Sequence, residues 1–277
     1  MTNFTNTMNR NHQLDFFRGL FLILILVDHY LTYENVVRKF TSEFIGWVSA
    51  AEAFVFLSGL TAGLVYTYRL REKGEAFIAA ASRKRAWDIY RYHIALLLLT
   101  VGVIFSHGAM QHFWEGRYGA IVQDPVTATL LGSLLLYQPI YLDILPMYAV
   151  FLLFVPLAVR SFEKGNQLPV LSVSFLGYLV GTFDLAPPAL GGGFLPQGID
   201  LGFFSLLSWQ FLFAVGLLLG FRTFHGKVGG LQRHKGLLLA ALAVSGALFL
   251  LKHSHASFGG VTCSTGWTKG TCGRSGS

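Results

Sequence analysis

The segment from about Leu14 to Tyr33 combines a strongly apolar run with groups that can move protons or hold charge. Arg18 and His29 are eleven residues apart, so an α-helix would place them on one face, about 16 Å apart along its axis. Asp28 stands directly before His29. A histidine with an acidic neighbour can act as a general base, because its ordinary pKa of about 6.5 suits proton removal at neutral pH. The alternative is a histidine that only packs between helices or lies at the membrane surface.

Two further carboxylates fall near the ends of apolar segments. Glu52 is expected at a depth similar to that of His29, where it would orient the imidazole and raise its basicity, or else be solvated at the membrane interface. Asp143 comes shortly before Pro146 on the expected outer side. It would either bind a polyhydroxylated ligand or cap the helix that follows.

A basic cluster lies between the second and third apolar segments. The stretch Arg69–Arg91 includes Arg85 and ends on Arg91. Guanidinium groups match phosphate oxygens with paired hydrogen bonds, so these two residues are candidates for binding an anionic donor substrate. The competing interpretation is that the cluster only records which loops face the cytoplasm.

The elements that must position these groups are membrane-spanning helices. The chain has 277 residues, of which 53% are hydrophobic and 13% charged, and its mean hydropathy is +0.53. These values exclude a soluble globular domain, and a helix of roughly 20 apolar residues crosses a bilayer. The sequence predicts an all-α, polytopic bundle with spans at about Leu14–Tyr33, Phe44–Tyr68, Ile89–His107, Tyr141–Val159, Leu168–Asp184, Leu201–Arg222 and Gly236–Lys252. The shorter segment Thr127–Ile140 is expected to be interfacial or re-entrant.

The distribution of positive charge predicts the orientation. Most of the 21 Lys and Arg residues lie before the first span, in Arg69–Arg91, in Arg160–Gly165 and in Arg222–Lys235. Cytoplasmic loops carry this excess, so the N-terminus is expected inside and Pro187–Asp200, which has no Lys or Arg, outside. The net charge of +7 then reflects topology, and no nucleic-acid partner is expected.

The organisation of the chain is simple until its end. Residues 1–257 are predicted to form one membrane domain, and residues 258–277 a polar, disordered tail that resembles a truncated or frame-shifted end. The tail holds Cys263 and Cys272, whose pairing is not expected. No Cys or His cluster has the spacing of metal ligands and no phosphate-binding loop is present, so neither a metal nor a bound cofactor is expected.

Five segments resemble parts of the OpgC family, in the same order and over about Asn11–Arg222. They are LDFFRGLFLILILVDHYLT, AAEAFVFLSGLTAGLVY, RAWDIYRYH, ILPMYAVFLLFVPLAV and LLSWQFLFAVG. The family is related to the membrane acyltransferases that include O-antigen acetylases. Arg18 and His29 match the R-x10-H pattern of that wider family.

The resemblance implies an O-acyltransferase of the bacterial inner membrane that attaches succinyl groups to a periplasmic glucan. It implies an acyl-CoA donor on the cytoplasmic side, His29 as the general base and Arg18 along the path of the donor. The chain supplies fewer spans than the family pattern before its aberrant tail, so an inactive fragment is one alternative. A transporter in which Asp28, His29 and Glu52 relay protons is another.

The predicted orientation can be tested by cysteine labelling in a background without Cys263 and Cys272. A membrane-impermeant reagent is expected to modify a cysteine placed at Gly192 and to spare one placed at Gly74, because Gly192 lies in the expected outer loop and Gly74 in the basic cytoplasmic segment. The reverse pattern would overturn the orientation.

Overall fold

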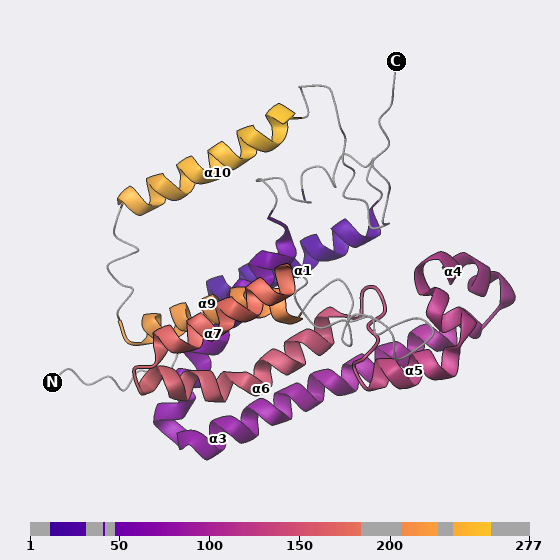
Figure 1. Cartoon of the computed structure of the whole chain (residues 1–277), viewed down its shortest axis with the longest axis horizontal. Coiled ribbons are helices and arrows are strands. Elements are labelled where there is room, and N and C mark those ends of the chain that lie inside the picture. Colours follow the sequence, from indigo (N-terminus) through magenta and orange to yellow (C-terminus); the bar gives the residue numbers. More distant parts are fainter. Residues whose placement is uncertain (1–11, 32–40, 42–47, 184–205, 227–234, 256–277) are drawn as a thin grey trace. The chain divides into compact units, whose positions relative to one another are not determined.

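The computed structural model describes residues 12–31, 41, 48–183, 206–226 and 235–255. Within these ranges the chain forms helices and no strand, which confirms the all-α prediction (Figure 1). The helices are α1 (His12–Tyr30), α3 (Ala50–Phe105), α4 (Gly108–Gln123), α5 (Pro125–Ser133), α6 (Ile144–Glu163), α7 (Gln167–Thr182), α9 (Leu206–Phe224) and α10 (Lys235–His255).

The chain divides into two compact units. The first comprises Met1–Leu20 and Glu52–Gly229, and the second comprises Phe21–Ala51 and Gly230–Ser277. The predicted outer loop Pro187–Asp200 and the tail 258–277, with both cysteines, lie outside the described residues.

Three of the described helices are long and apolar enough to cross a membrane: α3, α6 and α9. The helix α7 and the part Leu239–Leu251 of α10 are apolar but shorter. Large apolar side chains such as Leu153, Phe154 and Leu157 of α6 are exposed, as expected for surfaces that meet lipid. The chain is therefore a helical membrane protein, and the larger number of spans stays a prediction.

The segment Arg69–Arg91 is helical, and the prediction of a loop there was wrong. The helix α3 runs through the whole segment and departs from helical geometry at Gly74, whose φ of 78° lies in the left-handed region open to glycine. Alanine, glutamate, lysine and arginine dominate the residues after Gly74, and these are strong helix formers. Basic residues were interpreted as loop residues because charge marks the side of the membrane and does not by itself end a helix.

The helices α3 and α9 touch through their backbones at four glycines. A Cβ atom on Gly63 would lie 2.2 Å from the carbonyl oxygen of Leu217, and one on Gly220 would lie 2.1 Å from that of Leu60. Gly59 and Gly216 are equally close to the facing backbone. Each helix thus carries two glycines four residues apart at the crossing, a spacing that lets two helix backbones approach closely.

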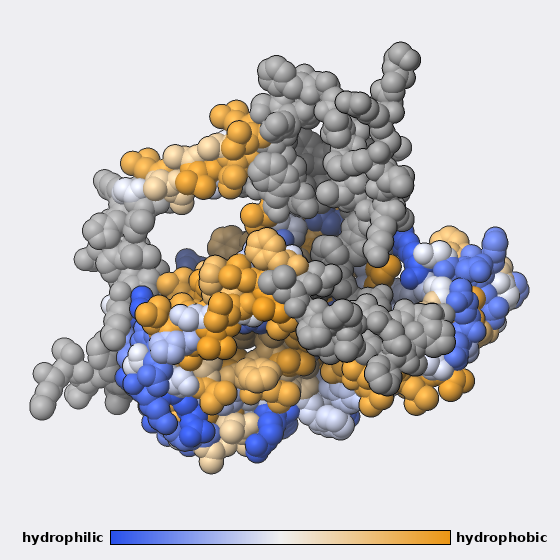
Figure 2. Space-filling view, in the orientation of Figure 1, coloured by the Kyte–Doolittle hydropathy of each residue, from blue (hydrophilic) through white to orange (hydrophobic). Residues whose placement is uncertain are grey.

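The helix α6 packs its other apolar face into the first unit. Its buried side chains meet aromatic residues of α9, with ring centres 5.2 Å apart for Phe151 and Phe213 and 5.4 Å apart for Phe162 and Phe221. In Figure 2, hydrophobic residues cover the visible faces of α6 and α7, whereas hydrophilic residues gather near the bend of α3. This division fits a bundle with a lipid-facing belt and a polar end.

The helix α7 is joined to α9 by a polar pair. Ser174 donates its hydroxyl hydrogen to the side-chain oxygen of Gln210, and the amide nitrogen of Gln210 donates to the carbonyl oxygen of Ser174. The same nitrogen contacts the carbonyl oxygen of Leu207. Gln210 therefore forms hydrogen bonds between helices α7 and α9.

We expect Gly63→Ala to lower the unfolding free energy by at least about 1–3 kcal/mol, because the new methyl group meets backbone atoms that cannot rotate away. The matched control is Gly102→Ala on the same helix, where nothing lies within 4 Å of the added Cβ atom. That variant should change stability by no more than about 1 kcal/mol. Thermal unfolding of the purified protein in detergent makes the comparison, and equal effects would show that the crossing tolerates a side chain.

Candidate functional site

The helix α1 carries three of the candidate residues, Arg18, Asp28 and His29. Arg18 is half-buried, and its guanidinium carbon lies 5.9 Å from the centre of the Phe54 ring of α3. The Nε atom of Arg18 is buried and makes no hydrogen bond with any residue that the structure describes. A buried guanidinium nitrogen without a partner is costly, which favours a role for Arg18 beyond helix packing.

Asp28 and His29 lie near the C-terminal end of α1, in the second unit. Asp28 is half-buried and accepts a hydrogen bond of 2.5 Å from the hydroxyl of Thr41, whereas His29 is exposed. Glu52 belongs to the first unit, where it is half-buried in the first turn of α3. The pairing of Glu52 with His29 therefore stays a prediction.

Contacts along α3 show that its second half runs antiparallel to α6. At one end Arg160 pairs with Glu75 at 2.7 Å, and further along Ser82 donates its hydroxyl hydrogen to the carbonyl oxygen of Leu152. The residues that face away from α6 are exposed and include Arg85 and Arg91. Arg85 and Arg91 thus lie on one helix with exposed side chains.

Three polar side chains are buried toward the other end of this antiparallel pair: His93 of α3, and Gln138 and Asp143 of the chain before α6. The exposed fractions of these side chains are 0%, 3% and 3%. Asp143 precedes α6 at the capping position, but its side chain makes no capping hydrogen bond. The expectation that Asp143 caps this helix through its side chain is therefore wrong, and its binding of a ligand stays a prediction.

His93 presents one satisfied and one unsatisfied ring nitrogen. Its Nε2 atom lies 3.1 Å from the carbonyl oxygen of Gly132, and because a carbonyl only accepts, Nε2 carries the hydrogen. The backbone of Leu142 also faces the ring. Nδ1 is buried and has no partner at hydrogen-bonding geometry among the described residues.

The connection between α5 and α6 is held by side chains from α3 and α4. Tyr90 donates its hydroxyl hydrogen to the carbonyl oxygen of Ser133 at 2.9 Å, and Tyr118 donates to that of Ile140 at 3.1 Å. Burial raises the pKa of the Tyr118 hydroxyl, with Tyr141 acting in the same direction. Tyr118 therefore stays protonated and continues to donate at any physiological pH.

The same connection contains backbone strain at two residues. Leu135 has a φ of 61° and Tyr141 a φ of 73°, in the left-handed region that residues with side chains rarely adopt. Arg117 holds Tyr141 by a hydrogen bond of 2.9 Å to its hydroxyl oxygen. Strain of this kind persists only where the surroundings fix it, and it concentrates at functional sites.

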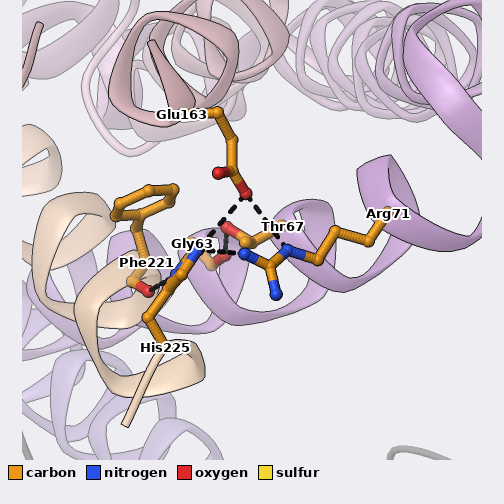
Figure 3. Close-up of polar contacts among 6 residues, drawn as sticks. All are labelled: Gly63, Thr67, Arg71, Glu163, Phe221 and His225. Atoms are coloured by element: carbon orange, nitrogen blue, oxygen red, sulfur yellow. Dashed lines mark hydrogen bonds and ion pairs between the residues drawn. The ribbon is translucent and has the colours of Figure 1, made fainter. Parts of the chain in front are cut away.

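A second polar cluster lies at the opposite end of α6 (Figure 3). The Nε atom of Arg71 lies 3.3 Å from a carboxylate oxygen of Glu163, and a terminal nitrogen of Arg71 lies 2.5 Å from Nε2 of His225. Arginine only donates, so Nε2 of His225 accepts, and Nδ1 donates to the carbonyl oxygen of Phe221 at 2.8 Å. This cluster joins the middle of α3, close to its break at Gly74, to the C-terminal ends of α6 and α9, and each of its three side chains has a partner.

Sequence reasoning missed His93 and Gln138 as parts of a site. The sequence did contain a signal for the burial of His93, because buried residues recur every three or four positions along one face of α3. That face consists of Ile78, Ser82, Ala86, Ile89, His93 and Leu97. Gln138 follows α5 in irregular chain, where no periodicity exists to reveal burial. Among the described residues no three His, Cys, Asp or Glu side chains are grouped as metal ligands would be.

Comparison with known proteins gives one match. A protein-family model described as "OpgC protein" matches residues 10–264, which is most of the chain. No curated protein and no solved structure matches.

The cluster of Arg71, Glu163 and His225 is half-exposed, so Glu163→Gln should lower the unfolding free energy by less than about 1 kcal/mol. The effect should shrink in high salt because salt screens exposed charges. Glu72→Gln on α3 is the matched control, since Glu72 is exposed and forms no ion pair with the described residues. Chemical unfolding at low and high salt measures both, and a salt-independent loss of several kcal/mol would contradict this view of the cluster.

Proposed function

Because the chain belongs to the OpgC family, we propose that it is a membrane-bound O-acyltransferase that modifies a periplasmic glucan or a related glycan. The acyl group in this proposal is succinyl, and the donor is an acyl-CoA that is consumed as a substrate. The match over residues 10–264 is the observation that carries the proposal. Helices α3, α6 and α9, each long and apolar enough to cross a membrane, support a multi-pass protein of the inner membrane.

The reaction needs a group that removes a proton from a sugar hydroxyl. We assign this role to His29, with Asp28 beside it and Glu52 as a further candidate for orienting the imidazole. As His29 takes the proton, the hydroxyl oxygen attacks the thioester carbonyl, the bond from carbonyl carbon to sulfur breaks, and the CoA thiolate leaves and takes up a proton. General-base assistance contributes about 10²–10⁴-fold to such a step.

The donor carries phosphates and needs cations that can reach them. Arg18 supplies a buried guanidinium whose Nε atom has no partner among the described residues, and Arg85 and Arg91 supply exposed ones on α3. Arginine binds phosphate oxygens through paired hydrogen bonds, and its charge persists at every relevant pH. We propose that these three residues hold the donor, which enters from the cytoplasm if the N-terminus is inside.

The acceptor is a neutral or weakly charged glycan and needs hydrogen-bonding groups. We assign this role to Asp143, whose carboxylate can accept hydrogen bonds from sugar hydroxyls and is buried at the start of α6. Mass spectrometry of periplasmic glycans from cells with and without the gene tests the function as a whole. Loss of an ester-linked acyl group from a glucan is the expected result, and identical glycan spectra would refute the proposal.

Replacing His29 by Gln is expected to reduce acyl transfer by about 10²–10⁴-fold, because glutamine keeps the volume and loses the titratable nitrogen. The control is His12→Gln, which changes an exposed histidine at the start of the same helix and should leave transfer unchanged. Acylated glycan is measured by mass spectrometry at equal amounts of membrane-inserted protein. Normal acylation by His29→Gln would end the catalytic assignment.

A companion variant tests the donor side. Arg18→Lys keeps the charge but loses the planar fork, so transfer should weaken mainly at low acyl-CoA concentration, as a rise in the KM for the donor. A fall in kcat with an unchanged KM would instead place Arg18 in the chemical step.

A further inference from the structure

We propose that α3 binds an anionic phospholipid, whose phosphate group lies on Arg83 and Lys84 and whose glycerol backbone lies on Trp87. The proposal goes beyond the acyltransferase activity and does not depend on it. Three observations carry it: the cations are exposed and unpaired, the side chains change in type along one face of the helix, and the cations lie beside an apolar helix.

The lipid would lie on the outer face of α3, opposite the buried stripe that contains Ser82 and His93. With about 100° of turn per residue, that face consists of Phe77, Lys84, Trp87, Arg91 and Leu98, with Arg83 at its edge. All of these side chains are exposed. The outer face is therefore open over about six helical turns.

Arg83 and Lys84 have no ion-pair partner among the residues that the structure describes. Asp88, one turn beyond Lys84, is half-buried and is not paired with either cation. Other cations of the same unit do have carboxylate partners, such as Arg160 with Glu75. The two positive charges on the outer face are thus free to bind an anion.

The order of side chains along the outer face matches the order of groups in a phospholipid. The cations come first, and Trp87 and Tyr92 follow with exposed fractions of 58% and 66%. Exposed aliphatic side chains come last, among them Leu98 and Leu99. Because tryptophan and tyrosine favour the level of lipid head groups, a molecule with a phosphate next to acyl chains fits the whole face. A small free anion would contact only its first turn.

The position of the cations along α3 calls for a negative charge. Arg160 of α6 pairs with Glu75, and Ser82 donates to the carbonyl oxygen of Leu152, so α6 runs beside this part of α3. Arg83 lies about 12 Å beyond Glu75 along the helix axis. It therefore lies beside the apolar length of a helix that is long enough to cross a membrane. Cations at such a level are costly unless anionic head groups or water reach them.

The acyl donor also carries phosphates, but its assigned residues can be separated from the lipid site. The donor was assigned to Arg85 and Arg91 on this helix, and both stay unchanged in the experiment. Arg85 lies about 160° around the helix from Arg83, on the other flank of the outer face. A succinyl group has no long chain that could cover Leu98 and Leu99.

The experiment titrates the purified full chain in detergent with phosphatidylglycerol or phosphatidylcholine and measures bound lipid by native mass spectrometry. The test variant combines Arg83→Gln with Lys84→Gln. One control exchanges the two cations, as Arg83→Lys with Lys84→Arg, and keeps both charges. The second control is Lys164→Gln, which removes an exposed cation just after α6.

Wild type is expected to bind phosphatidylglycerol more tightly than phosphatidylcholine. Losing both cations should weaken phosphatidylglycerol binding roughly 25-fold, because each cation near a lipid surface contributes about fivefold. Phosphatidylcholine binding should hardly change, and both controls should bind phosphatidylglycerol as wild type does. Equal phosphatidylglycerol affinity in wild type and the test variant would overturn the proposal.

Two further ligands identify the source of the phosphate. Glycerol phosphate, which lacks acyl chains, should bind far more weakly than phosphatidylglycerol, and equal affinity would replace the lipid site with a site for free anions. Succinyl-CoA should not displace phosphatidylglycerol from wild type. Displacement, together with a higher donor KM in the test variant, would assign the two cations to the donor and overturn the proposal.

Trp87 gives an independent measurement of where the lipid lies. Phosphatidylglycerol with bromine atoms near the start of its acyl chains should quench part of the tryptophan fluorescence of wild type. Trp87→Phe should remove that part of the quenching and leave the quenching of the other tryptophans. Identical quenching of wild type and Trp87→Phe would show that the lipid does not lie on the outer face.

Discussion

The close approach of α3 and α9 is the contact on which the first unit depends. At Gly63 and Gly220 the two backbones leave no room for a single methyl group, so the helices touch without intervening side chains. In a bilayer the hydrophobic effect gives little drive for helices to associate, and such contact supplies dispersion and close packing instead. The aromatic pairs between α6 and α9, and the bonds of Gln210 to α7, are then made by other side chains of α9.

The first unit has polar side chains near both ends of α6, and the two ends differ in whether each polar group has a hydrogen-bond partner. At its C-terminal end Glu163 accepts from Arg71, and every polar group of that cluster has a partner. At its N-terminal end His93 keeps an unsatisfied nitrogen beside a strained connection. A satisfied network stabilises one arrangement of helices, whereas an unsatisfied buried group costs free energy. The first end is therefore interpreted as structural.

The sequence predicted the apolar helices and their order because apolar length in a membrane chain leaves few alternatives, but it did not predict α4. It failed at Arg69–Arg91, where charge was mistaken for irregular structure. One helix carries this segment into the span predicted at Ile89–His107, so the buried stripe that reaches His93 was missed. The pairing of Glu52 with His29 depends on contacts between units, and no pattern within one segment contains that information.

The phase of α3 has a consequence for how the chain tolerates insertions and deletions. Ile78, Ser82 and His93 share a buried stripe that is kept in register with α6 over several turns. Adding one residue anywhere between them turns everything beyond it by about 100°, which would bring a basic side chain into the core and carry the imidazole to the surface. Exposed positions such as Arg83 accept many replacements, but the count of residues is fixed. Gly74 is the place where a change of length is least harmful, because the helix is already interrupted there.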